Sequence, residues 1–198
     1  MKLSKKWLFL VIPLLLACLA YFAYRHYYIH NIFEEIYYNQ EYSLGTPALE
    51  RIEGVYNPAS GEPIVDELQH EEYDEEHLPD SVTSLGYSFN YAKKRFSFEI
   101  RYDIENDSPQ TLNISYQYDV SSRQLLRKLW IFNGASHDNN KEYIQAYLEE
   151  HNSSIDECVT FGDNVVKSVL LKDWCSVYNS RYSPDDWGDV TVKSKWDS

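Results

Sequence analysis

Cysteine, glycine and positive charge are all scarce in this sequence of 198 residues. Its 3 Cys are too few for a disulfide scaffold, and its 7 Gly leave few places where the backbone could closely surround a ligand. The 18 Lys and Arg are outnumbered by 31 Asp and Glu, which gives a formal net charge of −13. Because phosphate binding needs a basic surface, this balance argues against a nucleic-acid-binding protein.

The sequence also lacks the motifs of common enzyme and metal classes. It contains no Gly-rich phosphate loop, no Gly-x-Ser-x-Gly elbow, and no His-Glu-x-x-His or Cys-x-x-Cys pair. The separation of His70 and His77 matches no metal-site template. Pairs of carboxylates always exist among 31 acidic residues, but their spacing singles out no acid–base pair. We therefore expect no enzymatic activity, no cofactor and no metal.

The residues that are present favour a folded domain with an uneven charge. Hydrophobic residues make up 43% of the chain and include 5 Trp, 18 Tyr and 8 Phe, which excludes a wholly disordered protein. The first 30 residues contain four basic residues and no acidic one, so residues 31–198 carry a formal charge of −17. The chain thus combines a basic N-terminal segment with a strongly acidic domain.

Residues 7–24 form an uncharged, mostly apolar stretch. As a helix rising 1.5 Å per residue, this stretch is about 27 Å long, close to the thickness of the hydrocarbon core of a bilayer. Three Lys precede it and only Arg25 follows closely, which by the positive-inside rule places the N-terminus in the cytoplasm. The sequence predicts a membrane anchor over residues 1–30, an extracellular acidic α+β domain over residues 31–198, and a single-pass location in the cell membrane.

Two other interpretations of the apolar stretch stay open, and both also place the domain outside the cell. A cleaved secretory signal would be cut after Ala20, with Cys18 at the third position, which is a mediocre cleavage site. The run Leu15-Leu16-Ala17-Cys18 is similar to a bacterial lipobox, in which Cys18 would carry a lipid. The chain stays apolar for six residues after Cys18, which is unusual for a lipoprotein.

Periodicity predicts a helix followed by an acidic segment at the start of the domain. Residues 31–40 have apolar positions at helical spacing. Residues 52–92 contain ten acidic residues and no Lys or Arg. This segment is interpreted as a solvated, partly flexible loop or, alternatively, as an acidic patch that steers a basic partner.

Alternation of apolar and polar residues then predicts a sheet. Residues 95–104 and 111–120 alternate strictly, which is typical of strands that are buried on one face only. Residues 82–91 and 124–132 have the character of flanking strands. Short turns between neighbours predict an antiparallel meander with one buried and one wet face.

The spacing changes in the last third of the chain. It predicts helices over residues 139–150 and 163–178, and a short last strand within residues 190–196. The fold class is therefore predicted as α+β: a single N-terminal transmembrane helix, then an antiparallel β-meander with helices packed on one face. Cys158 and Cys175 lie in the part expected outside the cell, where they could form a disulfide or remain two buried thiols.

Several strings in this sequence resemble the TipC family of immunity proteins from Gram-positive bacteria. They are IFEEIYYN at residues 32–39, RIEGVYN at residues 51–57, YAKKRFSFEIRYDI at residues 91–104 and ISYQYDV at residues 114–120. The resemblance implies a membrane-anchored, outward-facing protein that binds a toxin exported by a type VII secretion system. It further implies that the toxin attacks the lipid-linked cell-wall precursor, and that inhibition works by occlusion without catalytic residues.

The wet face of the predicted meander is the candidate toxin-binding surface. A domain with a charge of −17 can speed the capture of a basic partner. The predicted contacts are Glu99, Arg101, Asp103, Gln117 and Asp119, with Glu71, Glu72, Asp74, Glu75 and Glu76 as steering acids. Rival interpretations are an accessory subunit of an envelope complex and an anchored enzyme acting on cell-wall or lipid substrates.

Overall fold

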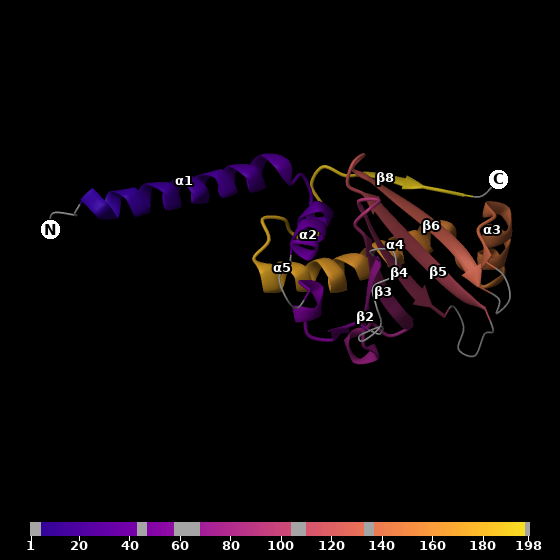
Figure 1. Cartoon of the computed structure of the whole chain (residues 1–198). Helices are drawn as coiled ribbons and strands as arrows, with labels where there is room; N and C mark the ends of the chain where they lie inside the picture. Colours follow the sequence, from indigo (N-terminus) through magenta and orange to yellow (C-terminus); the bar gives the residue numbers. More distant parts are fainter. Residues whose placement is uncertain (1–4, 43–46, 58–67, 104–109, 133–136, 197–198) are drawn as a thin grey trace.

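The protein is built around a sheet whose first seven strands lie side by side in the order in which they occur in the chain (Figure 1). The computed structural model describes residues 5–42, 47–57, 68–103, 110–132 and 137–196. Within these residues the sheet has eight strands. They are β1 (Val55–Tyr56), β2 (Leu68–Tyr73), β3 (Val82–Asn90), β4 (Arg95–Tyr102), β5 (Thr111–Asp119), β6 (Gln124–Phe132), β7 (His137–Asp138) and β8 (Thr191–Ser194).

Neighbouring strands from β1 to β7 pair antiparallel, whereas β8 pairs in parallel with β6. Tight turns join β3 to β4 and β5 to β6, and each contains a residue with positive φ, Lys94 at 51° and Arg123 at 54°. These turns set the register, so that Phe96 lies opposite Tyr118 and Ile100 opposite Ile114. The strict alternation seen in the sequence therefore corresponds to β4 and β5.

The acidic segment of residues 52–92 is more ordered than a loop. Its described residues contribute β1, β2 and β3, together with a 3-10 turn, η2 (Glu75–His77). A second 3-10 turn, η1 (Leu49–Arg51), precedes β1. Residues 58–67 of the segment lie outside the described residues.

The helices pack in one layer on one face of the sheet (Figure 1). They are α2 (Ile32–Glu41), α3 (Lys141–Glu150), α4 (Ile155–Val165) and α5 (Lys172–Tyr178). A π-helical turn, η3 (Val166–Leu171), joins α4 to α5 without a break. Asn31, Asn140 and Ser154 cap α2, α3 and α4, each accepting a hydrogen bond from the backbone N–H three residues on. The helix predicted over residues 163–178 thus begins earlier than its apolar spacing indicated, at Ile155.

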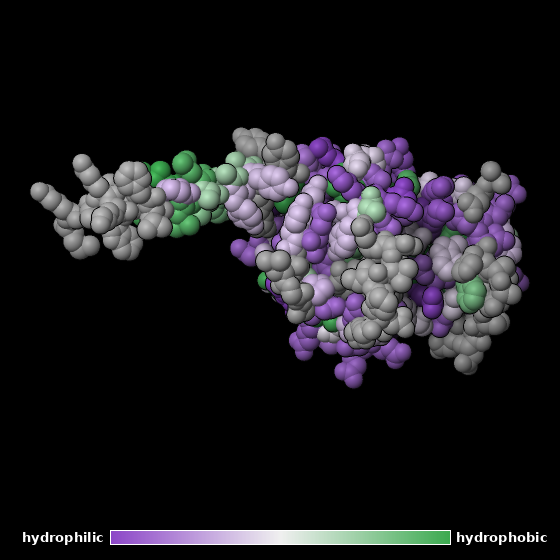
Figure 2. Space-filling model, in the orientation of Figure 1, coloured by the Kyte–Doolittle hydropathy of each residue, from purple (hydrophilic) through white to green (hydrophobic). Residues whose placement is uncertain are grey.

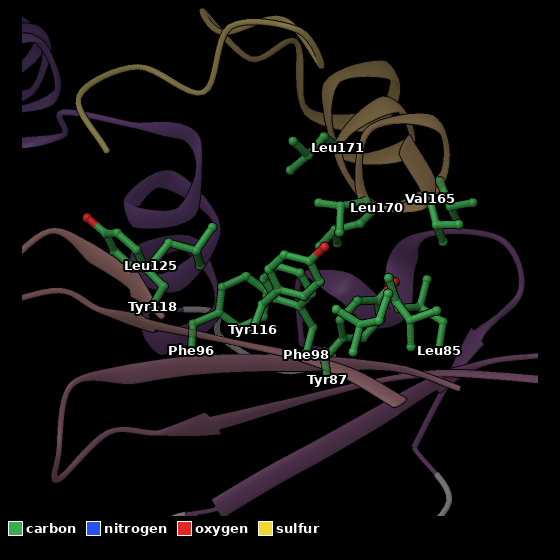
Figure 3. Packing of buried hydrophobic residues seen from close by; sticks show 14 of the residues in the cluster. Leu85, Tyr87, Phe96, Phe98, Tyr116, Tyr118, Leu125, Val165, Leu170 and Leu171 are labelled. Carbon is green, nitrogen blue, oxygen red and sulfur yellow. The ribbon is translucent and has the colours of Figure 1, made fainter. Parts of the chain in front are cut away.

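The core lies between this helical layer and the sheet. Side chains of β3, β4 and β5 point toward the helices, as Tyr87, Phe98 and Tyr116 show in Figure 3. Aromatic rings stack across neighbouring strands, with 4.8 Å between the ring centroids of Phe98 and Tyr116. Leu170 approaches from the helical side and is fully buried. Each such large side chain stabilises the fold by roughly 1.5–3 kcal/mol through burial, so the layers are held by one continuous aromatic and aliphatic core.

The C-terminal segment returns to the N-terminal end of α2. The Ile32 N–H donates to the Trp187 carbonyl at 3.2 Å, and the Asp189 N–H donates to the His30 carbonyl at 3.0 Å. The Trp187 ring meets the Phe33 ring edge-on, 5.3 Å between centroids. This contact holds α2 in place between the sheet and the C-terminal segment.

Helix α1 (Lys5–Tyr28), which contains the stretch predicted to cross a membrane, extends away from the rest of the molecule (Figure 1). Figure 2 shows its hydrophobic side chains beside the mostly hydrophilic surface of the sheet and helices. Among the described residues, however, no helix meets the combined requirement of length and apolar character for a membrane crossing.

This finding overturns the predicted N-terminal transmembrane helix, and with it that part of the predicted fold class. The predicted single-pass location in the cell membrane, and the membrane as a binding partner, are wrong for the same reason. The division of the chain at residue 30 stays a prediction.

Candidate functional site

The sheet has two unlike faces, because its alternate residues point in opposite directions. One face carries the core. The other, which we call the open face, carries half-buried or exposed side chains at alternate positions of β3, β4, β5 and β6. Helices α2 to α5 pack against the core face (Figure 1). The open face is therefore the large surface on which the fold presents polar side chains from four neighbouring strands.

Strand register brings four of the predicted contact residues together on the open face. Glu99 lies opposite Ser115, and Arg101 lies opposite Asn113. On the same two strands, Gln117 lies opposite Ser97 and Asp119 lies opposite Arg95. The period-2 reading of the sequence thus placed these four residues on one surface.

Asp119 is the most strongly held acid of this group. The Ser122 N–H and hydroxyl donate to its Oδ1 at 2.9 and 3.0 Å, and the Arg95 Nε lies 3.6 Å from its Oδ2. Burial alone would raise the pKa of Asp119, but these hydrogen bonds and the Arg95 charge outweigh it and lower the pKa below its usual range. Asp119 is thus kept ionised as a fixed negative charge at the end of β5.

A hollow of about 320 Å³ opens on this face over β2 to β5. Its floor is made of small residues, and charged side chains stand around it. The lining residues are Glu72, Ser84, Gly86, Tyr87, Ser88, Ser97, Phe98, Glu99, Arg101 and Ser115.

The two acids of the hollow flank one glycine. Gly86 pairs with Glu72 on one side and with Glu99 on the other. Since Gly86 has no side chain, space is left between the two carboxylates. Tyr56 donates its hydroxyl to Glu72 Oε2 at 3.3 Å, and Arg101 Nη2 lies 3.7 Å from Glu99 Oε1.

The other predicted contacts lie elsewhere. Asp103 comes after the last residue of β4 and lines a separate hollow with Glu157, Cys158 and Phe161 of α4. The alternation that would have placed it on the open face ends with the strand at Tyr102, so it does not join the group.

The predicted steering acids are also divided. Asp74, Glu75 and Glu76 are exposed in the turn after β2, where Asp74 Oδ1 lies 3.1 Å from His77 Nδ1. Glu71 is paired with Tyr87 by backbone register, and its side chain lies outside what the structure describes. Of the five, only Glu72 lines the hollow.

Two residues of the open face, Lys128 and Trp130, were not in the predicted set. Register places Lys128 opposite Ser115 and Trp130 opposite Asn113. The signal was available, because β6 alternates with the same period of two, with Leu125, Leu129 and Ile131 buried. Asn113 was assigned to the wet face, yet it is fully buried.

A polar cluster also occurs on the core face. Arg127 Nη1 pairs with Asp163 of α4 at 2.9 Å, and the Tyr116 hydroxyl donates to the same carboxylate at 2.7 Å. Burial and the adjacent Asp163 raise the pKa of Tyr116, which keeps its hydroxyl protonated as a donor. This cluster joins α4 to the sheet.

Metal and disulfide chemistry find no support in the part of the chain that the structure describes. No group of three or more His, Cys, Asp or Glu there could hold a metal ion. Cys158 and Cys175 are free thiols. Cys175 donates to the Tyr182 carbonyl at 3.4 Å, and the Cys158 sulfur lies 3.8 Å from the Ser153 hydroxyl.

Comparisons with known proteins agree on one family. The structure is similar to that of TipC2 from Streptococcus intermedius B196, with a TM-score of 0.72 and 24% sequence identity over 85% of this chain and 97% of that chain. No curated protein matches the sequence. The family model described as TipC immunity protein-like matches residues 5–195. This confirms the resemblance found in the sequence: the chain belongs to the TipC immunity protein-like family, and it is a toxin-binding immunity protein rather than an enzyme.

Proposed function

We propose that this immunity protein neutralises its toxin by occlusion, binding it with the open face of the sheet. The observation that carries this proposal is the gathering of Glu99, Arg101, Gln117 and Asp119 on the face that the core does not use, where Glu99 and Arg101 also line a hollow. The resemblance to the TipC family supports a toxin that is exported by a type VII secretion system and attacks the lipid-linked cell-wall precursor.

The size of the open face suits a protein partner. Strands β3 to β6 have eight or nine residues each, so they are about 30 Å long, and with β2 they span roughly 24 Å across at about 4.8 Å per strand. The resulting area of roughly 700 Å² approaches the about 800 Å² that each partner contributes to a standard interface.

The charge of the domain supports rapid capture. Residues 31–198 carry a formal charge of −17, and complementary charge accelerates the encounter of two proteins. A toxin with a basic surface around its active site would be drawn to the acids of the open face and covered there. Salt should slow this association, because it screens exposed charges.

The test compares charge reversals on two surfaces. The secreted proteins of the source organism are passed over the immobilised full chain, the captured toxin is identified by mass spectrometry, and its Kd is measured for the variants. We expect the double variant Glu99→Lys, Asp119→Lys to weaken binding at least tenfold and to abolish protection of growing cells. The matched control is Glu142→Lys, an exposed acid of α3.

Equal binding by the open-face variant and the control variant would disprove the placement of the toxin on this face. Recovery of only subunits of an envelope complex would contradict toxin binding itself.

A further inference from the structure

Asn113 is anomalous on the open face. Its neighbours along β5 on the same face, Thr111 and Ser115, are half-buried, whereas Asn113 is 0% exposed. Register places it between two large side chains, Arg101 of β4 and Trp130 of β6. A polar side chain is thus fully buried on the face that otherwise carries accessible polar groups.

Both ends of the Asn113 amide are engaged. Its Oδ1 accepts a hydrogen bond from Arg101 Nε at 3.1 Å, and its Nδ2 donates to the Thr111 carbonyl at 3.2 Å. Burying an amide is unfavourable unless its hydrogen bonds are made. The second bond fixes the orientation of the amide, so that its oxygen must face Arg101.

The consequence for Arg101 is a fixed guanidinium. An arginine side chain loses much rotamer freedom when it is immobilised in an interface, and Asn113 has already removed part of that freedom. Arg101 nevertheless stays accessible, with 46% of its side chain exposed, and its Nη2 lies only loosely beside Glu99, at 3.7 Å. Such half-exposed, long ion pairs contribute little, so a better acceptor can replace Glu99.

We propose that Arg101, held in position by Asn113, receives a carboxylate of the toxin at the rim of the hollow. The guanidinium presents its two terminal nitrogens as a planar fork, which matches a carboxylate in bidentate geometry. The proposal rests on the proposed function and adds the chemistry of the contact. The toxin surface is then an acidic side chain surrounded by basic ones, which meet Glu72, Glu99 and Asp119. In this arrangement Arg101 contacts the toxin and Asn113 is a positioning residue.

The first experiment is a double-mutant cycle, with the toxin captured by the unaltered full chain as the probe. We expect Arg101→Ala to raise Kd by about 10- to 100-fold, and Arg101→Lys to recover little, since an ammonium cannot form the fork. Asn113→Ala should also weaken binding, but not in the Arg101→Ala background, because it acts only through Arg101.

Lys172→Ala is the control, because Lys172 is an exposed cation of α5, outside the open face. Thermal unfolding of Asn113→Ala separates a binding defect from a folding defect. If Asn113→Ala fails to fold, Arg101→Ala still tests the proposal, because the Arg101 side chain is exposed. Unchanged binding by Arg101→Ala would overturn the proposal. If Glu99→Lys, Asp119→Lys still loses binding in that case, the proposed function survives without it.

A charge swap then identifies the carboxylate. The variant Arg101→Glu is tested against toxin variants in which each surface Asp or Glu is changed to Arg. Restored binding by one of them supports the pairing and names the partner residue. Failure of every such toxin variant to restore binding contradicts the proposal.

Discussion

Asp119 shows how a single side chain fixes charge on the open face and also couples stability to pH. Its pKa is lowered because the hydrogen bonds from Ser122 and the charge of Arg95 outweigh the effect of burial. A carboxyl whose pKa is lower in the folded than in the unfolded chain stabilises the fold above its ordinary pKa of about 4. This contribution is lost as the pH falls through the lowered pKa.

We therefore expect Asp119→Asn to be less stable than the unaltered protein at pH 6, and the difference to shrink as the pH falls below about 4. Urea unfolding at a series of pH values measures it. The exposed Asp156→Asn of α4 serves as the control. A difference that stays constant, or grows on acidification, would show that the hydrogen bonds of Asp119 contribute nothing through its charge.

Period-2 alternation predicted Glu99, Arg101, Gln117 and Asp119 on one surface, because a strand that is buried on one side leaves a strong local signal. It could not predict that Asn113 is buried there. That burial depends on the neighbouring strands β4 and β6, which place Arg101 and Trp130 opposite it. Asp103 was misplaced for a related reason, since the local pattern continues past the point where pairing with β5 ends.

At the scale of elements, the caps of α2 and α3 are a natural comparison. Both are asparagines whose Oδ1 accepts the N–H three residues on. Asn31 is fully buried and also donates to the Tyr118 hydroxyl at 2.6 Å and to the Asp189 carbonyl at 3.0 Å. Asn140 is exposed. Asn31 thus connects α2 to β5 and to the C-terminal segment, whereas Asn140 caps the N-terminus of α3.

We expect Asn140→Ala to cost about 1 kcal/mol of unfolding free energy, the usual value of an N-cap. Asn31→Ala should cost about 2–4 kcal/mol, because it also leaves buried partners without their hydrogen bonds. Denaturant unfolding of the two variants measures both values. Equal costs would mean that the additional hydrogen bonds of Asn31 contribute nothing to the fold.

The ends of elements were harder to predict than their existence. The helix from Ile155 was expected to start at residue 163, because its apolar spacing is clearest there. The earlier start was indicated by Ser154 and Glu157, a serine followed three residues later by a glutamate, in which Ser154 Oγ accepts the Glu157 N–H at 3.3 Å. The strand β2 was not predicted, because its four central residues are all polar and its sequence does not alternate.

At the scale of the whole molecule, the start of α2 closes against the segment that precedes β8. Asn31 and Gly188 form an isolated antiparallel bridge, and β8 then pairs with β6. These contacts join residues far apart in the sequence, and local periodicity carries no information about them. The last strand could be anticipated from alternation, but its parallel partner could not.

Gly188 is the position where this closure is most sensitive. Its φ is +80°, and a Cβ added there would lie 2.6 Å from the His30 carbonyl oxygen. We expect Gly188→Ala to destabilise the protein by about 1–3 kcal/mol and to speed amide hydrogen exchange at the start of α2. Gly54→Ala is the comparison variant, because the φ of Gly54 is also positive, at +83°. A Cβ added at Gly54 would meet the His77 side chain, which is exposed and can move.

The expected order is therefore a larger loss for Gly188→Ala than for Gly54→Ala, with faster exchange in α2 confined to the former. Similar losses in both variants, with exchange in α2 unchanged, would show that the closure does not hold α2.

The meander also has a consequence for how such proteins diversify. Because β3 to β6 follow one another in the chain, the open face is encoded within one stretch, residues 82–132, whose strands direct alternate residues into the core. If the toxin binds the open face as proposed, substitutions at the alternate positions alter partner choice with little effect on packing. A duplicated gene can therefore acquire a new specificity through changes within one short exchangeable segment, while its ancestral scaffold is inherited unchanged.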